Sequence, residues 1–211
     1  RALYNFATVT LSARYFDIIK DRLYTFAPRN KARRSAQTAL YKIADALARV
    51  LAPVLVFTAD EIWENLPGRE QAEPSVHLAT FLTADSGNDE ALVARWDRLF
   101  EIRDEVLRAL ETARVAKQIG SSLEAKVTLS ASGETFDLLS SQKNELRYLF
   151  IVSQVELVES KDVKDVSISV TQADGEKCER CWNYSTHVGE SQKYPTVCER
   201  CARALDESLA S

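Results

Sequence analysis

The apolar and polar positions in the first part of the chain follow a helical pattern. In residues 1–27, apolar side chains recur every three to four positions, with an interruption near Thr10–Ser12, and this is the spacing of one helix face. Ser12 is a suitable N-cap for the helix after the interruption. Pro28 is expected to end that helix, because proline lacks the backbone N–H that a helix interior requires.

Two further helices are predicted after a short basic segment. One covers about residues 35–51, with Ser35 as a candidate N-cap, and the other covers about residues 54–66. Three antiparallel helices would form a bundle, which we expect to occupy residues 1–80. The loop-like segment after the third helix contains His77, which we expect to be a structural group rather than a catalytic one.

The longest helical pattern runs from Asp89 to Ile119, and its apolar positions keep a spacing of three to four residues. Gly120 is a suitable residue to end it, because glycine readily adopts the left-handed conformation found after helix C-termini. We expect residues 81–120 to form a long connecting helix between the bundle and the rest of the chain.

Beyond this helix the hydrophobic period changes to the alternation of strands. The predicted elements are strands at 123–129, 150–158 and 163–171 and helices at 134–141 and 143–150. They would form a small α+β junction domain over residues 121–173. The predicted fold is therefore multi-domain, with an all-α helical bundle, a small α+β unit and a cysteine-rich tail.

All four cysteines of the chain lie in that tail, over residues 174–211. They form two Cys-Glu-Arg-Cys knuckles separated by sixteen residues, and they are Cys178, Cys181, Cys198 and Cys201. Two such pairs suit tetrahedral Zn²⁺, which thiolates bind at about 2.3 Å. Because four protein ligands leave no open position, the sequence predicts one structural zinc ion.

Other uses of these cysteines stay open at this point. Two disulfides would require an oxidising compartment, a redox motif would require one knuckle to open a helix after a strand, and iron can use the same four sulfurs. His187, between the two pairs, is either a spare ligand or a loop residue exposed to solvent. We expect the metal to be a folding element, because so short a segment cannot bury a core of its own.

Composition and charge narrow the classes of function. Apolar residues make up 45% and charged residues 27%, as in ordinary globular proteins, and we expect a monomeric cytoplasmic protein that is part of a longer chain. Residues 1–50 hold ten Lys/Arg and three Asp/Glu, whereas residues 51–211 hold seventeen and twenty-eight. A basic first quarter on an acidic chain favours a local anionic partner such as nucleic acid, although a solvated helix face would have the same composition.

The sequence carries none of the common catalytic signatures. There is no Walker loop, no GxGxxG and no GxSxG motif. Two histidines do not provide an acid–base cluster, and no nucleophile has an evident base nearby. We therefore expect a binding module without catalytic residues.

Three stretches resemble the C-terminal region of bacterial isoleucyl-tRNA synthetases. Residues 11–24 are similar to the motif Leu-Ser-x-x-Tyr-x-Asp-x-x-Lys-Asp-Arg-Leu-Tyr, although Thr10 precedes it where the family usually has an acidic residue. Residues 33–38, 51–55 and 75–78 resemble the anticodon-binding bundle, and the knuckles with Trp182 resemble the zinc tail. The bundle motifs alone would also fit valyl-tRNA and leucyl-tRNA synthetases. The bundle together with the cysteine-rich tail makes the resemblance specific to isoleucyl-tRNA synthetases.

This resemblance implies that the chain binds the anticodon stem-loop of isoleucine tRNA, so that the parent ligase can attach isoleucine with ATP. The catalytic and editing domains of the family are missing from the sequence. Basic side chains would position phosphates, and aromatic ones would stack on loop bases. The candidates for contact with tRNA are Lys20, Arg22, Arg29, Lys31, Arg33, Arg34, Arg180, Trp182 and Tyr184.

Two rival interpretations come from other classes of protein. DNA repair glycosylases of the formamidopyrimidine type end in a similar four-cysteine finger, but a long helical bundle before the finger does not fit them. A purely structural protein-interaction module is the other rival. We expect no DNA and no membrane partner. Trp182 has two possible roles, stacking on RNA or packing over the metal site.

Overall fold

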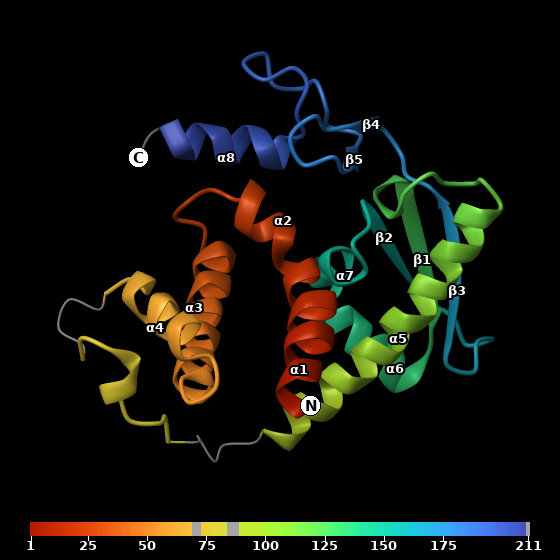
Figure 1. Cartoon of the computed structure of the whole chain (residues 1–211). Coiled ribbons are helices and arrows are strands. Elements are labelled where there is room, and N and C mark those ends of the chain that lie inside the picture. The colour runs from red at the N-terminus through yellow and green to blue at the C-terminus, as the bar shows by residue number, and fades with distance from the viewer. Residues whose placement is uncertain (69–72, 84–88, 210–211) are drawn as a thin grey trace. The chain divides into compact units, whose positions relative to one another are not determined.

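The computed structural model describes residues 1–68, 73–83 and 89–209 (Figure 1). The chain divides into two compact units, one made of Arg1–Ala27 with Asp89–Ser211 and the other of Pro28–Asn88. This division differs from the predicted bundle over residues 1–80 and the predicted connecting helix over 81–120. The reason is that the first helix packs apolar side chains such as Ile18 against the α/β core.

The first helix is continuous where a break was predicted. Its parts are α1 (Ala2–Asn5), a π-helical segment (Phe6–Phe16) and α2 (Asp17–Thr25). Ser12 lies inside the π segment and therefore caps nothing. A π turn holds more residues than an α turn, so it accommodates the irregular apolar spacing near Thr10 without ending the helix. The backbone becomes extended at Phe26, shortly before Pro28.

The helical unit contains α3 (Lys31–Leu51) and α4 (Val56–Asn65), followed by a short 3₁₀ helix at Val76–Leu78. Helix α3 starts earlier than predicted because the Asn30 side chain, rather than that of Ser35, accepts the first free backbone N–H groups. Small residues let the helices approach closely. The buried core of this unit consists of Ala48, Ala52, Ala59, Trp63 and Val76.

Helix α5 (Glu90–Val115) belongs to the α/β unit and is not a free connector. Asp89 caps its N-terminus by accepting the Leu92 N–H at 2.9 Å. The helix ends before the predicted Gly120, and the left-handed residue after it is Lys117, with φ of 57°. From Leu99 onward, its apolar face is buried against the sheet and α7.

A three-stranded sheet forms the centre of this unit, with the order β2-β1-β3. The elements are β1 (Ala125–Ala131), α6 (Gly133–Ser141), α7 (Lys143–Phe150), β2 (Gln154–Glu159) and β3 (Val166–Gln172). β1 runs parallel to β2 and antiparallel to β3. Apolar residues on β1 such as Leu129 lie opposite apolar partners on both neighbours, while polar residues alternate on the other face. The helices therefore cover only one face (Figure 1).

The cysteine-rich tail follows the sheet and has little regular structure. It contains a two-stranded sheet of β4 (Glu176–Lys177) and β5 (Tyr184–Ser185), and helix α8 (Glu199–Leu209) follows the second knuckle's first cysteine. Gly175 begins the tail at φ of 87°, and a Cβ there would lie 2.3 Å from the Ser185 carbonyl oxygen, so only glycine fits. No helix among the described residues is long and apolar enough to cross a membrane.

Candidate functional site

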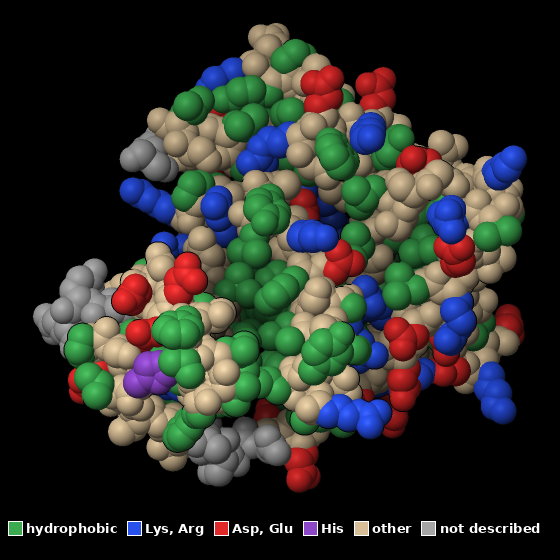
Figure 2. All heavy atoms as spheres, in the orientation of Figure 1, with side chains coloured by type: hydrophobic (Ala, Val, Ile, Leu, Met, Phe, Trp, Pro, Cys, Tyr) green, Lys and Arg blue, Asp and Glu red, His purple; other side chains and the backbone are tan. Residues whose placement is uncertain are grey.

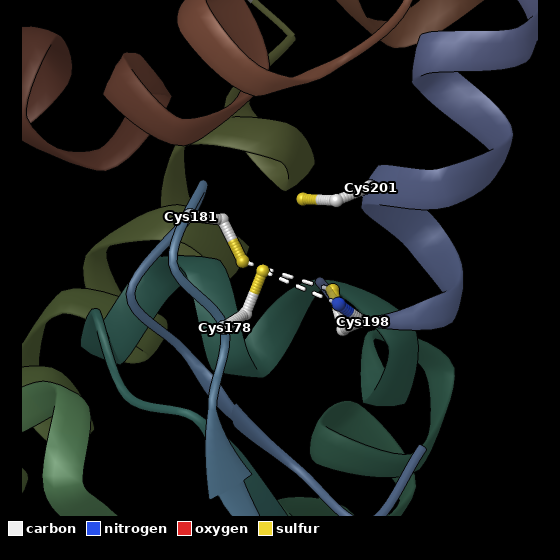
Figure 3. A group of neighbouring side chains, drawn as sticks. All are labelled: Cys178, Cys181, Cys198 and Cys201. Atoms are coloured by element: carbon white, nitrogen blue, oxygen red, sulfur yellow. Dashed lines mark hydrogen bonds between the residues drawn. The ribbon is translucent and has the colours of Figure 1, made fainter. Parts of the chain in front are cut away.

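The four cysteines converge on one point inside the tail, which we call the finger (residues 174–209). Their sulfur atoms all lie within 4.8 Å of one another, and all four residues are buried. Cys178 and Cys181 come from the first knuckle, whereas Cys198 and Cys201 lie at the start of α8 (Figure 3). Apart from Val197 and Ala202, the buried core of the finger is these four side chains.

The sulfur positions suit a tetrahedral ion and not a disulfide. The sulfurs of Cys181 and Cys198 are 3.8 Å apart, far longer than a sulfur–sulfur bond of about 2.05 Å. A tetrahedron with metal–sulfur bonds of about 2.3 Å has edges of about 3.8 Å. The described cysteines therefore fit one structural zinc ion.

The thiols of Cys181, Cys198 and Cys201 lie close enough to shift one another's pKa. Hydrogen bonds from Cys198 and Cys201 lower the pKa of the Cys181 thiol, while the pKa of Cys198 is raised to about 11, chiefly by its hydrogen bond with Cys181. Clustered thiols cannot all ionise alone, because each thiolate opposes the next. A divalent ion removes this opposition, so the four ligands bind together.

Hydrogen-bond donors surround the sulfurs and orient them. The Cys198 N–H donates to the Cys178 sulfur at 3.3 Å, and Arg180 Nη1 lies 3.5 Å from the Cys201 sulfur. Such outer contacts fix ligand geometry and offset the charge of a tetrathiolate. His187 is exposed and its Nδ1 contacts Glu190 at 2.7 Å, so it is not one of the clustered ligands.

The arginines of both knuckles reach across to the end of helix α2. Arg200 makes two-pronged contact with the Asp21 carboxylate, at 2.6 and 3.1 Å, and its Nη1 also donates to Thr25 Oγ1 at 2.9 Å. Arg180 donates to the Thr25 carbonyl oxygen at 2.5 Å. The finger is thereby docked on α2 through two residues at equivalent positions of a repeated motif.

The finger is also tied to the sheet side of the same unit. Ser153 is buried, donates its hydroxyl hydrogen to the Leu123 carbonyl and accepts the Tyr184 N–H at 2.7 Å. The Gln154 side-chain amide pairs with both backbone groups of Asp174, at 2.9 and 3.0 Å. The metal site thus has a defined position relative to α2 and to the sheet.

A cavity of about 430 Å³ lies where the finger meets α2 and α7. Its walls combine aromatic rings, basic groups and carboxylates. The lining residues are Asp17, Ile18, Lys20, Asp21, Tyr24, Thr25, Leu123, Arg147, Tyr148, Ile151, Val152, Arg180, Cys181, Trp182 and Asn183. An opening of this composition offers flat rings for stacking and donors for oxygen atoms.

Trp182 is held in this wall in an unusual conformation. Its φ is 64°, a left-handed value that bulky residues seldom adopt. Its backbone N–H donates to the Cys178 carbonyl oxygen at 2.8 Å. The residue is 61% exposed and does not belong to the buried finger core. Lys177 Nζ lies 5.4 Å from the ring centre. The ring therefore lies on the surface instead of covering the metal site.

The comparison with known families decides what kind of module this is. Residues 1–129 match the family described as the anticodon-binding domain of tRNA ligase, and residues 175–204 match a zinc finger found in FPG and IleRS. The chain belongs to the family of tRNA-ligase anticodon-binding domains. The second match covers all four cysteines and supports the structural zinc ion.

Curated relatives point to one member of the tRNA ligases. The chain is 49% identical to an isoleucine–tRNA ligase of Syntrophotalea carbinolica, with 98% of this chain and 23% of that protein covered. It is 48% identical to the isoleucine–tRNA ligase of Gloeobacter violaceus, with 97% of this chain and 22% of that protein covered. It is 46% identical to the isoleucine–tRNA ligase of Geobacter sulfurreducens, with 97% of this chain and 23% of that protein covered. The chain thus spans less than a quarter of the relatives it matches. The predicted resemblance to the C-terminal region of isoleucyl-tRNA synthetases is confirmed.

Within this anticodon-binding chain, some predicted contact residues already have protein partners. Arg22 pairs with Glu145 and lies over the Tyr148 ring, and Arg180 is engaged in docking the finger. Lys20 contacts Asp17 at 3.1 Å and is largely exposed. Tyr184 is half-buried beside Ser153 and does not line the cavity.

The remaining predicted basic residues belong to the helical unit. Arg29 precedes α3, and Lys31, Arg33 and Arg34 occupy its first turn. This turn contains no acidic residue, although an acidic side chain would suit the positive end of the helix dipole. Arg29, Lys31 and Arg34 are exposed and Arg33 is half-buried.

Sequence reasoning missed several residues of the cavity and of the docking contact. Tyr24, Arg147 and Tyr148 line the cavity, and Arg200 holds the finger to α2. The repeated Cys-Glu-Arg-Cys pattern was a usable signal for Arg180 and Arg200, because a residue repeated between two ligand pairs suggests a shared role. Tyr148 had no comparable signal, since aromatic residues in short helices are usually core.

Proposed function

We propose that this chain is the tRNA-recognition part of an isoleucine–tRNA ligase, and that it binds the anticodon stem-loop of isoleucine tRNA in the cytoplasm. The rest of the ligase would attach isoleucine using ATP. The observation that carries the proposal is a single chain that joins an anticodon-binding domain to an IleRS-type finger, with an aromatic-lined cavity beside the finger.

The cavity supports recognition of unpaired bases. Loop bases are read by stacking on aromatic rings and by hydrogen bonds to their edges, and one stacked base contributes about 1–3 kcal/mol. Trp182 and Tyr24 are both exposed at the cavity. The Asn183 side chain is engaged with the Cys181 carbonyl oxygen, so base edges would be read by other groups.

The first turn of α3 supports binding of phosphates. Its exposed cations lie at the positive end of the helix, a place where anions bind favourably. Because phosphate contacts carry no sequence information, these residues would set affinity and the cavity would set selectivity. Figure 2 shows basic side chains interspersed with acidic ones over the α/β unit, so contacts there would rest on individual side chains.

Two rival functions are less well supported. The finger family also includes DNA repair glycosylases, but the match over residues 1–129 is to tRNA ligases. A protein-interaction module would not account for the match to an anticodon-binding domain. We infer that the chain acts on tRNA as a monomer and has no DNA partner.

A competition binding experiment tests the proposal. Labelled anticodon stem-loop of isoleucine tRNA is titrated with the 211-residue chain, and the competitors are the same stem-loop with an exchanged anticodon and duplex DNA of equal length. We expect the exchanged stem-loop to compete at least tenfold less well, because base stacking and edge contacts are lost. Equal competition by the exchanged stem-loop or by DNA would refute the proposal.

A further inference from the structure

We propose that Arg200 is a positioning residue that couples the metal-held finger to the RNA-binding cavity through Asp21 and Thr25. This inference rests on the proposed function for the identity of the bound RNA. The coupling itself is a property of the protein and can be measured without RNA.

Arg200 contacts Asp21 and Thr25 of α2 in a specific geometry, and we call this contact the clamp. The guanidinium binds both oxygens of the Asp21 carboxylate and also the Thr25 hydroxyl. The two charged side chains are only 16% and 22% exposed, and the guanidinium lies 5.0 Å from the centre of the Phe26 ring. A paired, two-pronged contact of this kind defines both distance and orientation.

The position of Arg200 depends on the metal site. It lies between Cys198 and Cys201, so two of the four expected ligands bracket it along the chain. Cys198 immediately precedes α8, and Arg200 and Cys201 lie in its first turn. An ion that holds both cysteines therefore holds the backbone from which the guanidinium reaches α2.

The clamp also determines the width of the cavity. Asp21, Tyr24 and Thr25 of α2 form one side, and Cys181 and Trp182 of the first knuckle contribute to another. Among the described residues, the hydrogen bonds between α2 and the finger come from Arg180 of the first knuckle and Arg200 of the second. Release of Arg200 would let α2 move away from Trp182 and would weaken simultaneous contact with a base.

Substitution of Asp21 separates this coupling from plain electrostatics. Asp21→Asn removes a negative charge at the cavity, so charge alone would make an RNA ligand bind more tightly. The clamp leads to the opposite expectation, because the amide cannot accept both guanidinium bonds. The direction of the change therefore distinguishes the two explanations.

The matched control is Asp206→Asn, which removes the same charge from the same unit. Asp206 pairs with Lys193 at 2.7 Å on the exposed surface of α8, and neither residue lines the cavity. We expect Asp21→Asn to bind the stem-loop roughly tenfold more weakly, within the usual range for coupled sites. Asp206→Asn should bind at least as tightly as the unmodified chain, and both variants should retain one zinc ion.

Amide hydrogen exchange in residues 21–25 tests whether Asp21 and the metal site act through the same contact. In the unmodified chain, removing zinc with a chelator should raise amide exchange in residues 21–25 as well as in the finger. In Asp21→Asn, exchange in residues 21–25 should already be raised, and zinc removal should add little. Such non-additivity is the mark of two changes that act through one contact.

Thr25→Val serves as a second variant without a change in charge. It removes one acceptor of Arg200 and keeps a branched side chain, so a smaller shift in the same direction is expected. Unchanged exchange in residues 21–25 in Asp21→Asn, loss of its zinc, or stem-loop binding as tight as in the control would overturn the inference. If the unmodified chain does not prefer the isoleucine stem-loop, the proposed function fails, while the exchange data still decide the coupling.

Discussion

The α/β unit and the finger stabilise themselves in opposite ways. The sheet and its helices bury a continuous apolar core that includes Ile102, Val127, Leu129, Leu146 and Phe150. The finger has four cysteines at its centre and only two short strands and one helix around them. In the first region, apolar burial offsets the entropy of ordering the chain. In the second, metal–sulfur bonds must do so.

This difference determines what each region can present to a ligand. A helix or strand turns its apolar side chains inward, so large exposed rings are uncommon there. A loop fixed by a metal can hold Trp182 outward and in a left-handed conformation. The finger is therefore suited to displaying a ring, and the α/β unit is suited to providing the rigid wall opposite it.

Loss of the metal should have the largest effect, and it should act on the finger and on the end of α2 that the finger contacts. We expect Cys178→Ser, or removal of zinc, to unfold the finger, because the metal-binding free energy of about 10–16 kcal/mol is its folding free energy. The sheet should remain folded. Hydrogen exchange should show lost protection in residues 176–205 and retained protection in β1. Readdition of zinc to the chelated chain is the control, and an ordered finger without metal would contradict the prediction.

A cavity in the apolar core should have the converse effect. Phe150 is fully buried, and Phe150→Ala should lower the free energy of unfolding of the α/β unit by about 3–5 kcal/mol. Denaturant unfolding measures this, and zinc content should stay at one ion per chain. Phe81→Ala makes the same chemical change at an exposed position and should alter stability by less than about 0.5 kcal/mol. Equal effects of the two substitutions would contradict the core assignment.

Trp182 should affect binding and stability in opposite directions. Trp182→Ala should weaken stem-loop binding by about 1–3 kcal/mol through loss of stacking, while Trp182→Phe should retain most of the affinity. Trp182→Gly should lose affinity as well, but it should stabilise the finger slightly because glycine adopts positive φ without strain. Titration calorimetry and thermal unfolding measure the two effects. Unchanged affinity in the alanine variant would show that the ring does not contact RNA.

The basic turn of α3 should contribute affinity without selectivity. Arg33→Ala combined with Arg34→Ala should weaken binding to all stem-loops and reduce the slope of log K against log salt by about 1.5. Arg108→Ala with Arg114→Ala removes the same charge from the exposed face of α5 and should change the slope less. Identical slopes for the two double variants would remove the α3 turn from the binding surface.

The smallest expected effect concerns the exposed ion pair of His187 and Glu190 in the finger. Contact with Glu190 raises the pKa of His187. The pair therefore stabilises the folded finger fully below the unfolded pKa of about 6.5, and this contribution is lost as pH rises through the folded pKa. An NMR titration should show the raised pKa, and Glu190→Gln should return it towards the ordinary value. A titration that is unaffected by Glu190→Gln would exclude the contact in solution.

Local sequence determined the elements that depend on neighbouring residues. The metal ligands were predicted from spacing alone, because a knuckle is a short-range turn that aims two sulfurs at one point. The strand alternation around Leu129 was also readable, since period-two burial follows from backbone geometry. Errors occurred where a cap or an unusual turn decided the boundary, as at Asn30 and Lys117.

The tertiary structure decided which of these elements belong together. The first helix groups with residues far along the chain because its apolar face packs on the sheet unit, and spacing cannot show against which partner a face will be buried. The same holds for Arg180 and Arg200: the sequence shows that they repeat, but only the fold places Asp21 and Thr25 within reach. Contacts between residues more than 150 positions apart depend on packing, and it is packing that forms the cavity beside Trp182.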